Sequence, residues 1–371
     1  MKTSRIIFFL LTFILLSHFD SSAQWERMVI PESGYNLNDV VMLDTLTAIT
    51  VGEFGTILIT HDGFRSWKRC AIKTKTDFYC LGFFDKKIAI TAGAEGAMMR
   101  STDSGETWQK TQQSTINVTL RRIAVLSPTV AVAVGNRGTI IRTTNAGKSW
   151  NKIASGTVLD LHSVSFNTSG VGIAVGKKGV IVRSIDYGTS WQLQNSPTQW
   201  DLNAVSMVDN IVCAGGDSAL IVRSVDSGSS WVLQAVLYTL SSDDRKNDLP
   251  DDILDIHFIN SSTGFLCGFF TIVNRVHYHR IYRTDDSGQS WRRILLPNVS
   301  ESDDKALNPT ANGIWKKLAF QNGKGFAVGY TTNDRSVSAI LSTSDAGVAW
   351  HIVLDRKIAD SLYPQSKSED N

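Results

Sequence analysis

The sequence predicts an all-β fold, a seven-bladed β-propeller built of four-stranded antiparallel blades. One phrase, Ser/Thr-x-Asp/Asn-x-Gly-x-Ser/Thr-Trp, occurs seven times in the 371 residues, twice with a small departure. The first five copies are spaced by 40 to 42 residues, and the last two intervals are 60 and 59. Short runs rich in Val, Ile and aromatic residues lie between the copies. A repeat near forty residues with several strands in each unit is typical of a propeller.

The repeated phrase, called the box below, predicts a tight turn between the third and fourth strands of each blade. Its acidic or amide side chain can accept hydrogen bonds from nearby backbone N–H groups, and its glycine supplies a positive φ. Because the same acid recurs in every unit, we interpret it as structural rather than catalytic or calcium-binding. The tryptophan should then lie in the core between neighbouring blades. The seven copies end at Trp67, Trp108, Trp150, Trp191, Trp231, Trp291 and Trp350.

The third unit shows the expected order of strands. Apolar runs at residues 120–126 and 131–134 are followed by the turn 135–138, the run 139–143, the box and a short run at 150–153. No helical period extends over eleven residues in the mature chain. Two ways of closing the ring stay open, because residues 25–30 resemble a fourth strand and the last unit has its own candidate at 350–354. Either one blade is shared or five-stranded, or one of these segments lies loose.

The N-terminus has the pattern of a secretory signal peptide. Lys2 and Arg5 precede an apolar run at residues 6–16, and Ser21-Ser22-Ala23 follows. The run is too short to span a bilayer. We therefore expect a signal peptide at 1–23, a propeller at 24–356 and a polar tail at 357–371. The product would be a monomer without a transmembrane anchor, periplasmic or extracellular.

The net charge argues against a nucleic-acid partner, and the cysteine spacing argues against a metal site. The formal charge is +2, and +1 without residues 1–23, so a nucleic-acid partner is not expected. Cys213 and Cys267 fit small core positions. Cys70 and Cys80 flank one connection and either form a disulfide or remain buried thiols. No Cys/His spacing resembles a metal site, and no cofactor is predicted.

The main candidate binding surface lies on the face opposite the boxes, in blades five to seven. Long loops at residues 234–253 and 297–313 and long hairpins at 269–280 and 330–338 all fall there. Arg275, His277, Tyr278 and His279 are candidate partner-binding residues in this sector. The alternative is loop lengthening without a ligand.

A second candidate is a polar ring where the innermost strands begin. The aligned positions are Asn38, Tyr79, Arg121, His162, Asn203, Leu254 and Lys316. Arg121 with Arg122, and Lys316 with Lys317, would make part of this rim basic and favourable to an anion. A water-filled channel would be polar without any ligand.

A third candidate is the arginine that directly precedes the box in five units. It either satisfies carbonyls or pairs with an acid of the next blade, or it contributes to a basic surface. These residues are Arg100, Arg142, Arg183, Arg223 and Arg283.

The segments 134–142 and 175–183, each followed by a box, resemble the photosystem II stability/assembly factor family of propellers. They also resemble the wider group of Asp-box, or BNR, repeat proteins. The resemblance covers nearly all of the mature chain. It implies an exported, non-enzymatic seven-bladed propeller that binds membrane-protein subunits during assembly, with the repeated arginines on the binding surface. The signal junction resembles that of an exported bacterial protein, for which the partner would differ.

A glycoside hydrolase, sialidase-like or xyloglucan-type, is the rival interpretation, because such enzymes also carry Asp boxes. Their chemistry needs two carboxylates at a defined separation on the loop face. Asp39, Asp252 and Asp255 stand at strand starts, but the sequence shows no pairing. The Arg-Ile-Pro segment of sialidases is absent. We therefore favour partner binding and assign no catalytic residue.

Overall fold

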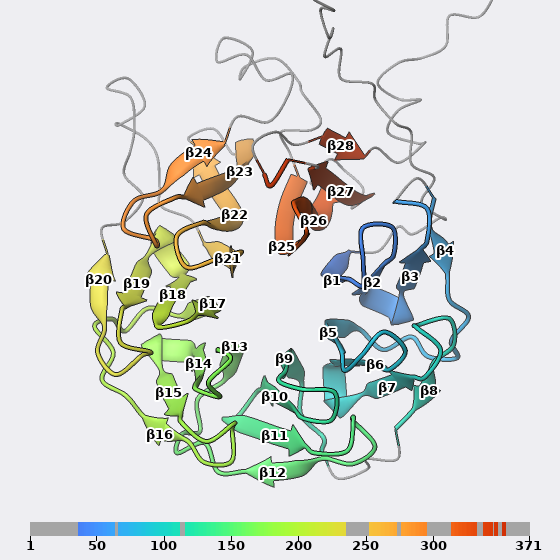
Figure 1. Cartoon of the computed structure of the whole chain (residues 1–371), viewed down its shortest axis with the longest axis horizontal. Coiled ribbons are helices and arrows are strands. Elements are labelled where there is room, and N and C mark those ends of the chain that lie inside the picture. The colour runs from blue at the N-terminus through green and yellow to red at the C-terminus, as the bar shows by residue number, and fades with distance from the viewer. Residues whose placement is uncertain are drawn as a thin grey trace, which may run out of the picture.

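The computed structural model describes residues 36–63, 66–111, 116–234, 252–272, 276–294, 313–331, 337–343, 345–347 and 351–353. The predicted signal peptide at residues 1–23, the segment 25–30 and the predicted C-terminal tail at 357–371 lie outside these ranges. The described strands form seven four-stranded sheets, and every strand pair is antiparallel. They are arranged in a ring around a central axis, like the blades of a propeller (Figure 1). The prediction of an all-β propeller of four-stranded antiparallel blades is confirmed.

Each blade is formed by four strands that follow one another in the sequence, from the channel outward. The first four blades are β1 (Leu37–Met42), β2 (Ala48–Gly52), β3 (Ile57–Thr60) and β4 (Lys68–Arg69); β5 (Phe78–Phe83), β6 (Ala89–Gly93), β7 (Met98–Ser101) and β8 (Gln109–Lys110); β9 (Leu120–Val125), β10 (Ala131–Gly135), β11 (Thr139–Thr143) and β12 (Asn151–Ile153); β13 (Leu161–Phe166), β14 (Gly172–Gly176), β15 (Ile181–Ser184) and β16 (Gln192–Leu193).

The remaining blades follow the same order, with longer second and third strands in the sixth and seventh. They are β17 (Leu202–Val208), β18 (Ile211–Gly216), β19 (Ile221–Ser224) and β20 (Val232–Gln234); β21 (Ile253–Phe258), β22 (Gly264–Ile272), β23 (Val276–Thr284) and β24 (Arg292–Ile294); β25 (Gly313–Gln321), β26 (Lys324–Thr331), β27 (Val337–Thr343) and β28 (His351–Val353). Short 3₁₀ turns η1 to η4 join the second and third strands at Glu53–Gly55, Ala94–Gly96, Lys177–Gly179 and Asp217–Ala219.

The ring closes between the first and seventh blades. The innermost strand β1 contacts both β5 and β25. Trp67 of the first blade shares a buried cluster with Ala319, Phe326 and Val328 of the seventh. The seventh blade takes its fourth strand, β28, from the end of its own unit. The candidate closing strand at residues 25–30 lies outside the described residues.

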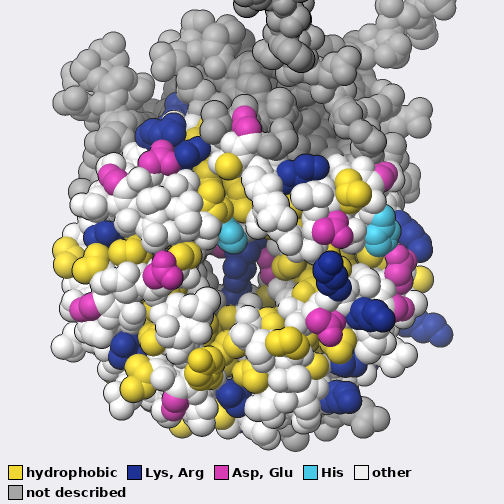
Figure 2. Space-filling view, in the orientation of Figure 1, with side chains coloured by type: hydrophobic (Ala, Val, Ile, Leu, Met, Phe, Trp, Pro, Cys, Tyr) yellow, Lys and Arg dark blue, Asp and Glu magenta, His cyan; other side chains and the backbone are white. Residues whose placement is uncertain are grey.

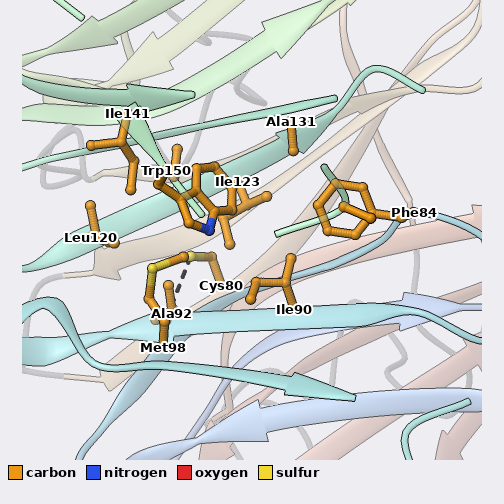
Figure 3. Packing of buried hydrophobic residues seen from close by; sticks show 12 residues of the cluster. Cys80, Phe84, Ile90, Ala92, Met98, Leu120, Ile123, Ala131, Ile141 and Trp150 are labelled. Carbon is orange, nitrogen blue, oxygen red and sulfur yellow. Dashed lines mark hydrogen bonds between the residues drawn. The ribbon is translucent and has the colours of Figure 1, made fainter. Parts of the chain in front are cut away.

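Six of the seven box tryptophans pack between adjacent blades, as predicted, and Trp350 lies outside the described residues. Trp150, which follows the third box, is 3% exposed and lies among Cys80, Ile90 and Met98 of the second blade (Figure 3). Burying a large ring in this way is a strong source of stability. The same arrangement recurs at Trp108, Trp191, Trp231 and Trp291.

Box turns bind their own polar groups. In the second blade, Asp103 Oδ1 accepts the Thr107 N–H at 2.9 Å, and Thr107 Oγ1 donates to Asp103 Oδ2 at 2.5 Å. The Ser101 hydroxyl accepts the Gly105 N–H at 2.9 Å. Gly105 has φ +94°, and a Cβ there would lie 1.9 Å from Ile49 Cδ1 of the first blade. The residue before the glycine is also left-handed in six boxes, which the sequence pattern did not predict.

Two faces of the ring can be distinguished by their turns. The box turns bind the turns between first and second strands, as where the Ser104 N–H donates to the Lys87 carbonyl. We call this the box face. The opposite face, called the loop face, carries the turns between second and third strands and the connections between blades. This division is as predicted.

All four cysteines are buried free thiols. Cys70 lies in the core between the first and second blades, whereas Cys80 lies in the core between the second and third. The disulfide alternative for this pair is therefore wrong. Cys213 and Cys267 occupy fully buried positions, as predicted. Within the described residues, no helix has the length and apolar character needed to cross a membrane.

Candidate partner-binding surface

The predicted polar ring consists of bulged residues. In all seven innermost strands the pairing skips this residue, as at Asn38 between Leu37 and Asp39. A bulge re-aims the side chain of the extra residue. The ring residues are all partly or fully exposed, whereas most of the residues that follow them are buried. The strand starts therefore present a ring of side chains at the channel mouth, on the loop face.

Several ring members bind one another or the adjacent turns. Lys316 Nζ donates to Asn38 Oδ1 at 2.9 Å, and Arg121 Nε donates to Asn136 Oδ1 at 2.7 Å. The Tyr79 hydroxyl lies 3.4 Å from Asp77 Oδ2. Burial, followed by the nearby charge of Arg121, lowers the pKa of His162, so its ring is neutral at neutral pH.

Next to this ring, four charged side chains meet across the channel. Arg122 of the third blade lies 3.6 Å from Asp39 of the first and 3.8 Å from Asp255 of the sixth. Lys317 of the seventh blade binds Asp255 Oδ1 at 2.5 Å. In Figure 2 the centre of the ring is hollowed, and charged side chains of both signs surround the opening. Two cations and two carboxylates therefore share the channel interior.

The two carboxylates also join neighbouring blades. The Leu81 N–H donates to Asp39 Oδ2 at 2.8 Å, and the Leu318 N–H donates to Asp255 Oδ2 at 2.9 Å. Burial raises the pKa of Asp39, opposed by the positive charges of Arg122 and Lys317. Burial, then repulsion by Arg122, lowers the pKa of Lys317. Arg122 and Lys317 are thus neutralised by acids, and a net positive rim at this level does not form.

The repeated arginines bind the next blade. Arg142 Nε donates to the Tyr187 carbonyl at 2.8 Å, inside the box of the fourth blade. Arg100, Arg183 and Arg223 make the same bond to the carbonyls of Ala146, Ser227 and Ser287. Arg283 instead binds Asp285 of its own box and lies over the Phe265 ring. Four of the five arginines therefore donate a hydrogen bond to a carbonyl of the next blade. Binding of a partner by any of the five stays a prediction.

An acid in the connection between blades binds the second-to-third-strand turn of the preceding blade. The N–H groups of Phe54, Arg137 and Lys178 donate to Asp77, Asp160 and Asp201, each at 2.8 Å. The three donors have φ between +51° and +55°, which is costly for residues other than glycine. These turns are thus held rigidly on the loop face. The signal was present in the sequence, as an aspartate two residues before the ring position in four units.

The candidate residues of the sixth blade lie on a long hairpin. His277, Tyr278 and His279 belong to β23 and pair with Thr271, Phe270 and Phe269 of β22. Arg275 lies outside the described residues, as do the loop segments 235–251 and 295–312. The structure confirms the long hairpin, and binding by these residues stays a prediction.

The acids considered for hydrolysis have structural partners. Asp39 and Asp255 are 2% and 4% exposed, and both accept backbone N–H groups beside cations. Burial, then the charge of Asp217, raises the pKa of Asp252, which also accepts the Ser218 N–H. Among the described residues, no group of three or more His, Cys, Asp or Glu side chains is placed to hold a metal ion.

Known structures share this fold over most of the chain. A structure titled "YCF48 bound to D1 peptide" is 18% identical with a TM-score of 0.62, covering 87% of this chain and 99% of that one. YCF48 from Cyanidioschyzon merolae is 20% identical with a TM-score of 0.61, covering 85% and 97%. The GH74 xyloglucanase from Xanthomonas campestris is 12% identical with a TM-score of 0.54, covering 85% of this chain and 60% of that one. At these identities the likeness shows the fold alone.

No curated protein matches the chain in sequence. The family model described as photosynthesis system II assembly factor YCF48 matches residues 16–159 and 143–295. These two matches overlap and together extend over more than half of the chain. On this evidence the chain belongs to the photosynthesis system II assembly factor YCF48 family.

Proposed function

We propose that this protein is an exported, non-enzymatic scaffold that binds a protein partner through its loop face. Family membership supports a binding role, and one structural neighbour is a YCF48 bound to a D1 peptide. The signal-peptide pattern at residues 1–23 supports export to the periplasm or beyond. The partner of this chain would be a membrane-protein subunit or another envelope protein.

The observation that carries the proposal is a difference between the two faces. On the box face, the aspartates and hydroxyls of the turns bind one another, and four of the repeated arginines bind carbonyls of the next blade. On the loop face, rigid turns present exposed side chains such as Phe54, which is 49% exposed. Rigid presentation lowers the entropic cost of binding. The long loops of blades five to seven would extend this surface, together with the channel-mouth ring.

Site-specific photo-crosslinking in cells tests which face binds. A photoreactive phenylalanine analogue replaces Phe54 on the loop face or Leu46 on the box face. The two residues belong to the same blade and are 49% and 52% exposed, so they are matched controls. We expect a discrete envelope-protein adduct from position 54 and none from position 46. An adduct from position 46 alone would contradict the assignment of the face.

Two further measurements test the remaining parts of the proposal. Replacement of residues 235–251 by a short Gly-Ser linker should lower recovery of the crosslinked partner, because this loop would extend the binding surface. N-terminal sequencing of the mature protein should begin at Gln24, and an intact Met1 in the purified envelope fraction would contradict export by cleavage after Ala23.

A further inference from the structure

On the loop face, the turns between second and third strands are acidic in some blades and basic in others. Glu53 and Glu95 occupy the turns of the first and second blades, and Asp217 occupies that of the fifth. Between them, the turns of the third and fourth blades carry Arg137, Lys177 and Lys178, all exposed. Because these turns have equivalent backbones, the difference lies in the side chains alone.

Two acids lie beside these cations, and both accept hydrogen bonds from the backbone of the turns. Asp160 and Asp201 accept the backbone N–H groups of Arg137 and Lys178, and Asp160 also lies 3.7 Å from Lys177 Nζ. Within the described ranges, no carboxylate lies within ion-pair distance of the side chains of Arg137, Lys178 or the neighbouring Lys152. This sector therefore has a net positive charge, because the four cations Arg137, Lys152, Lys177 and Lys178 outnumber the carboxylates of Asp160 and Asp201. The overall formal charge of the chain is only +2.

A hollow lies beside these cations. It has a volume of about 650 Å³ and is lined by Arg137 and Lys152 together with the connection from Ile153 to Val158. Val158 is 84% exposed at its edge, and Trp200, in the equivalent connection of the next blade, is 57% exposed. A Cβ on Gly138 would lie 2.0 Å from the Thr157 carbonyl oxygen, so the turn and the connection are closely packed. The hollow is thus part of a rigid surface.

We propose that this sector of the third and fourth blades, defined by Arg137, Lys152, Lys178, Val158 and Trp200, binds an acidic segment of the partner that carries an apolar side chain. The inference rests on the proposed function and adds the chemistry of the partner. Unpaired cations next to exposed apolar side chains fit a segment that alternates carboxylates with apolar residues. A lipid surface would meet the cations but would not fill the hollow. A nucleic acid would favour a far more positive protein.

Binding of a defined probe tests the proposal. The probe is a fluorescent synthetic peptide with several glutamates and two leucines, and its fluorescence anisotropy reports binding to the purified mature protein. We expect the variant Arg137→Glu/Lys178→Glu to bind at least about tenfold more weakly than wild type, because two attractive contacts become repulsive. The milder Arg137→Gln/Lys178→Gln variant should fall between them. Val158→Ser should also weaken binding, because the apolar contact is lost.

A control variant on the box face distinguishes the effect of this sector from the effect of net charge alone. Lys86 and Lys148 are exposed lysines on the box face, so Lys86→Glu/Lys148→Glu makes the same change in net charge. This control should keep wild-type affinity. The proposal is wrong if both double variants bind alike, or if a peptide with glutamine in place of glutamate binds as tightly. It is equally wrong if phosphatidylglycerol vesicles bind the wild-type protein while the acidic peptide does not.

The crosslinking experiment separates this inference from the proposed function. If Arg137→Glu/Lys178→Glu protein still captures the partner from position 54 as wild type does, the loop face binds but the basic sector is not its contact. If wild-type protein captures no partner at all, the proposed function itself fails. If the wild-type protein captures the partner and the Arg137→Glu/Lys178→Glu variant captures less of it, the result supports both the proposed function and the basic sector as a contact.

Discussion

Arg122 and Asp255 face each other across the channel, with 3.8 Å between the guanidinium and the carboxylate, although they belong to the third and sixth blades. The same guanidinium lies 3.6 Å from Asp39 of the first blade. One side chain therefore links three blades that are not neighbours along the ring. Lys317 of the seventh blade completes the network through Asp255.

We predict that Arg122→Met destabilises the protein by about 3 kcal/mol, because two buried carboxylates lose a shared cation. Chemical denaturation followed by tryptophan fluorescence measures the effect. The neighbouring Arg121 is exposed and donates to the neutral Asn136 side chain, so Arg121→Met should change the unfolding midpoint much less. Equal effects of the two substitutions would show that the channel network does not stabilise the ring.

A second prediction concerns the tryptophans of the boxes. Trp150→Ala should cost about 3–5 kcal/mol, because it empties a closely packed site between the second and third blades. Trp200→Ala is the control, since Trp200 is 57% exposed. Thermal unfolding of both variants measures the difference. Similar melting temperatures would contradict the role assigned to the indole between blades.

Most of the fold could be predicted from the sequence because each unit repeats the same local signals. The box tryptophan, its glycine and the apolar runs act within one blade or between adjacent blades. Their order is therefore the same in every unit, and the first five boxes recur every 40 to 42 residues. The left-handed residue before the box glycine, such as Tyr187 with φ +58°, was not predicted, because no residue type marks it.

The channel network could not be predicted in the same way. Asp39, Arg122, Asp255 and Lys317 occupy equivalent positions in four units, but the paired residues lie 62 to 133 positions apart along the chain. Only closure of the ring brings them together. The sequence alone indicates that Arg122 and Lys317 are basic residues of the rim, because it does not show that Asp39 and Asp255 lie beside them.

The third prediction separates the two interpretations of the repeated arginines. Arg142→Lys removes the Nε–H that binds the Tyr187 carbonyl of the next blade, so we expect a loss of about 1 kcal/mol. Arg283→Lys is the comparison, because Arg283 binds Asp285 within its own blade. Amide hydrogen exchange of the fourth-blade box should increase in the first variant only. Unchanged exchange together with weaker partner capture would favour the partner-binding interpretation.

The last prediction concerns acid stability of the boxes. Burial alone would raise the pKa of Asp226, but hydrogen bonds from the hydroxyl and N–H of Ser230 and from Ser224 lower it to about 2. Because the folded pKa lies below the usual value near 4 of an unfolded chain, the ionised box stabilises the fold above that value. This contribution should be lost as the pH falls from about 4 to about 2.

Asp226→Asn tests this, because the third box already contains an amide at the same position. Asn145 accepts the Ser149 N–H at 2.9 Å and donates to Ser149 Oγ at 2.8 Å, so an amide keeps the turn intact. The variant should unfold near the wild-type temperature at neutral pH and lose less stability than wild type on acidification to about pH 3, since its amide does not titrate. Carbon-13 NMR of the Asp226 carboxyl should give the depressed pKa directly. If the variant loses as much stability as wild type on acidification, protonation of Asp226 does not cause the acid unfolding. Other groups, such as the remaining box aspartates, would then cause it.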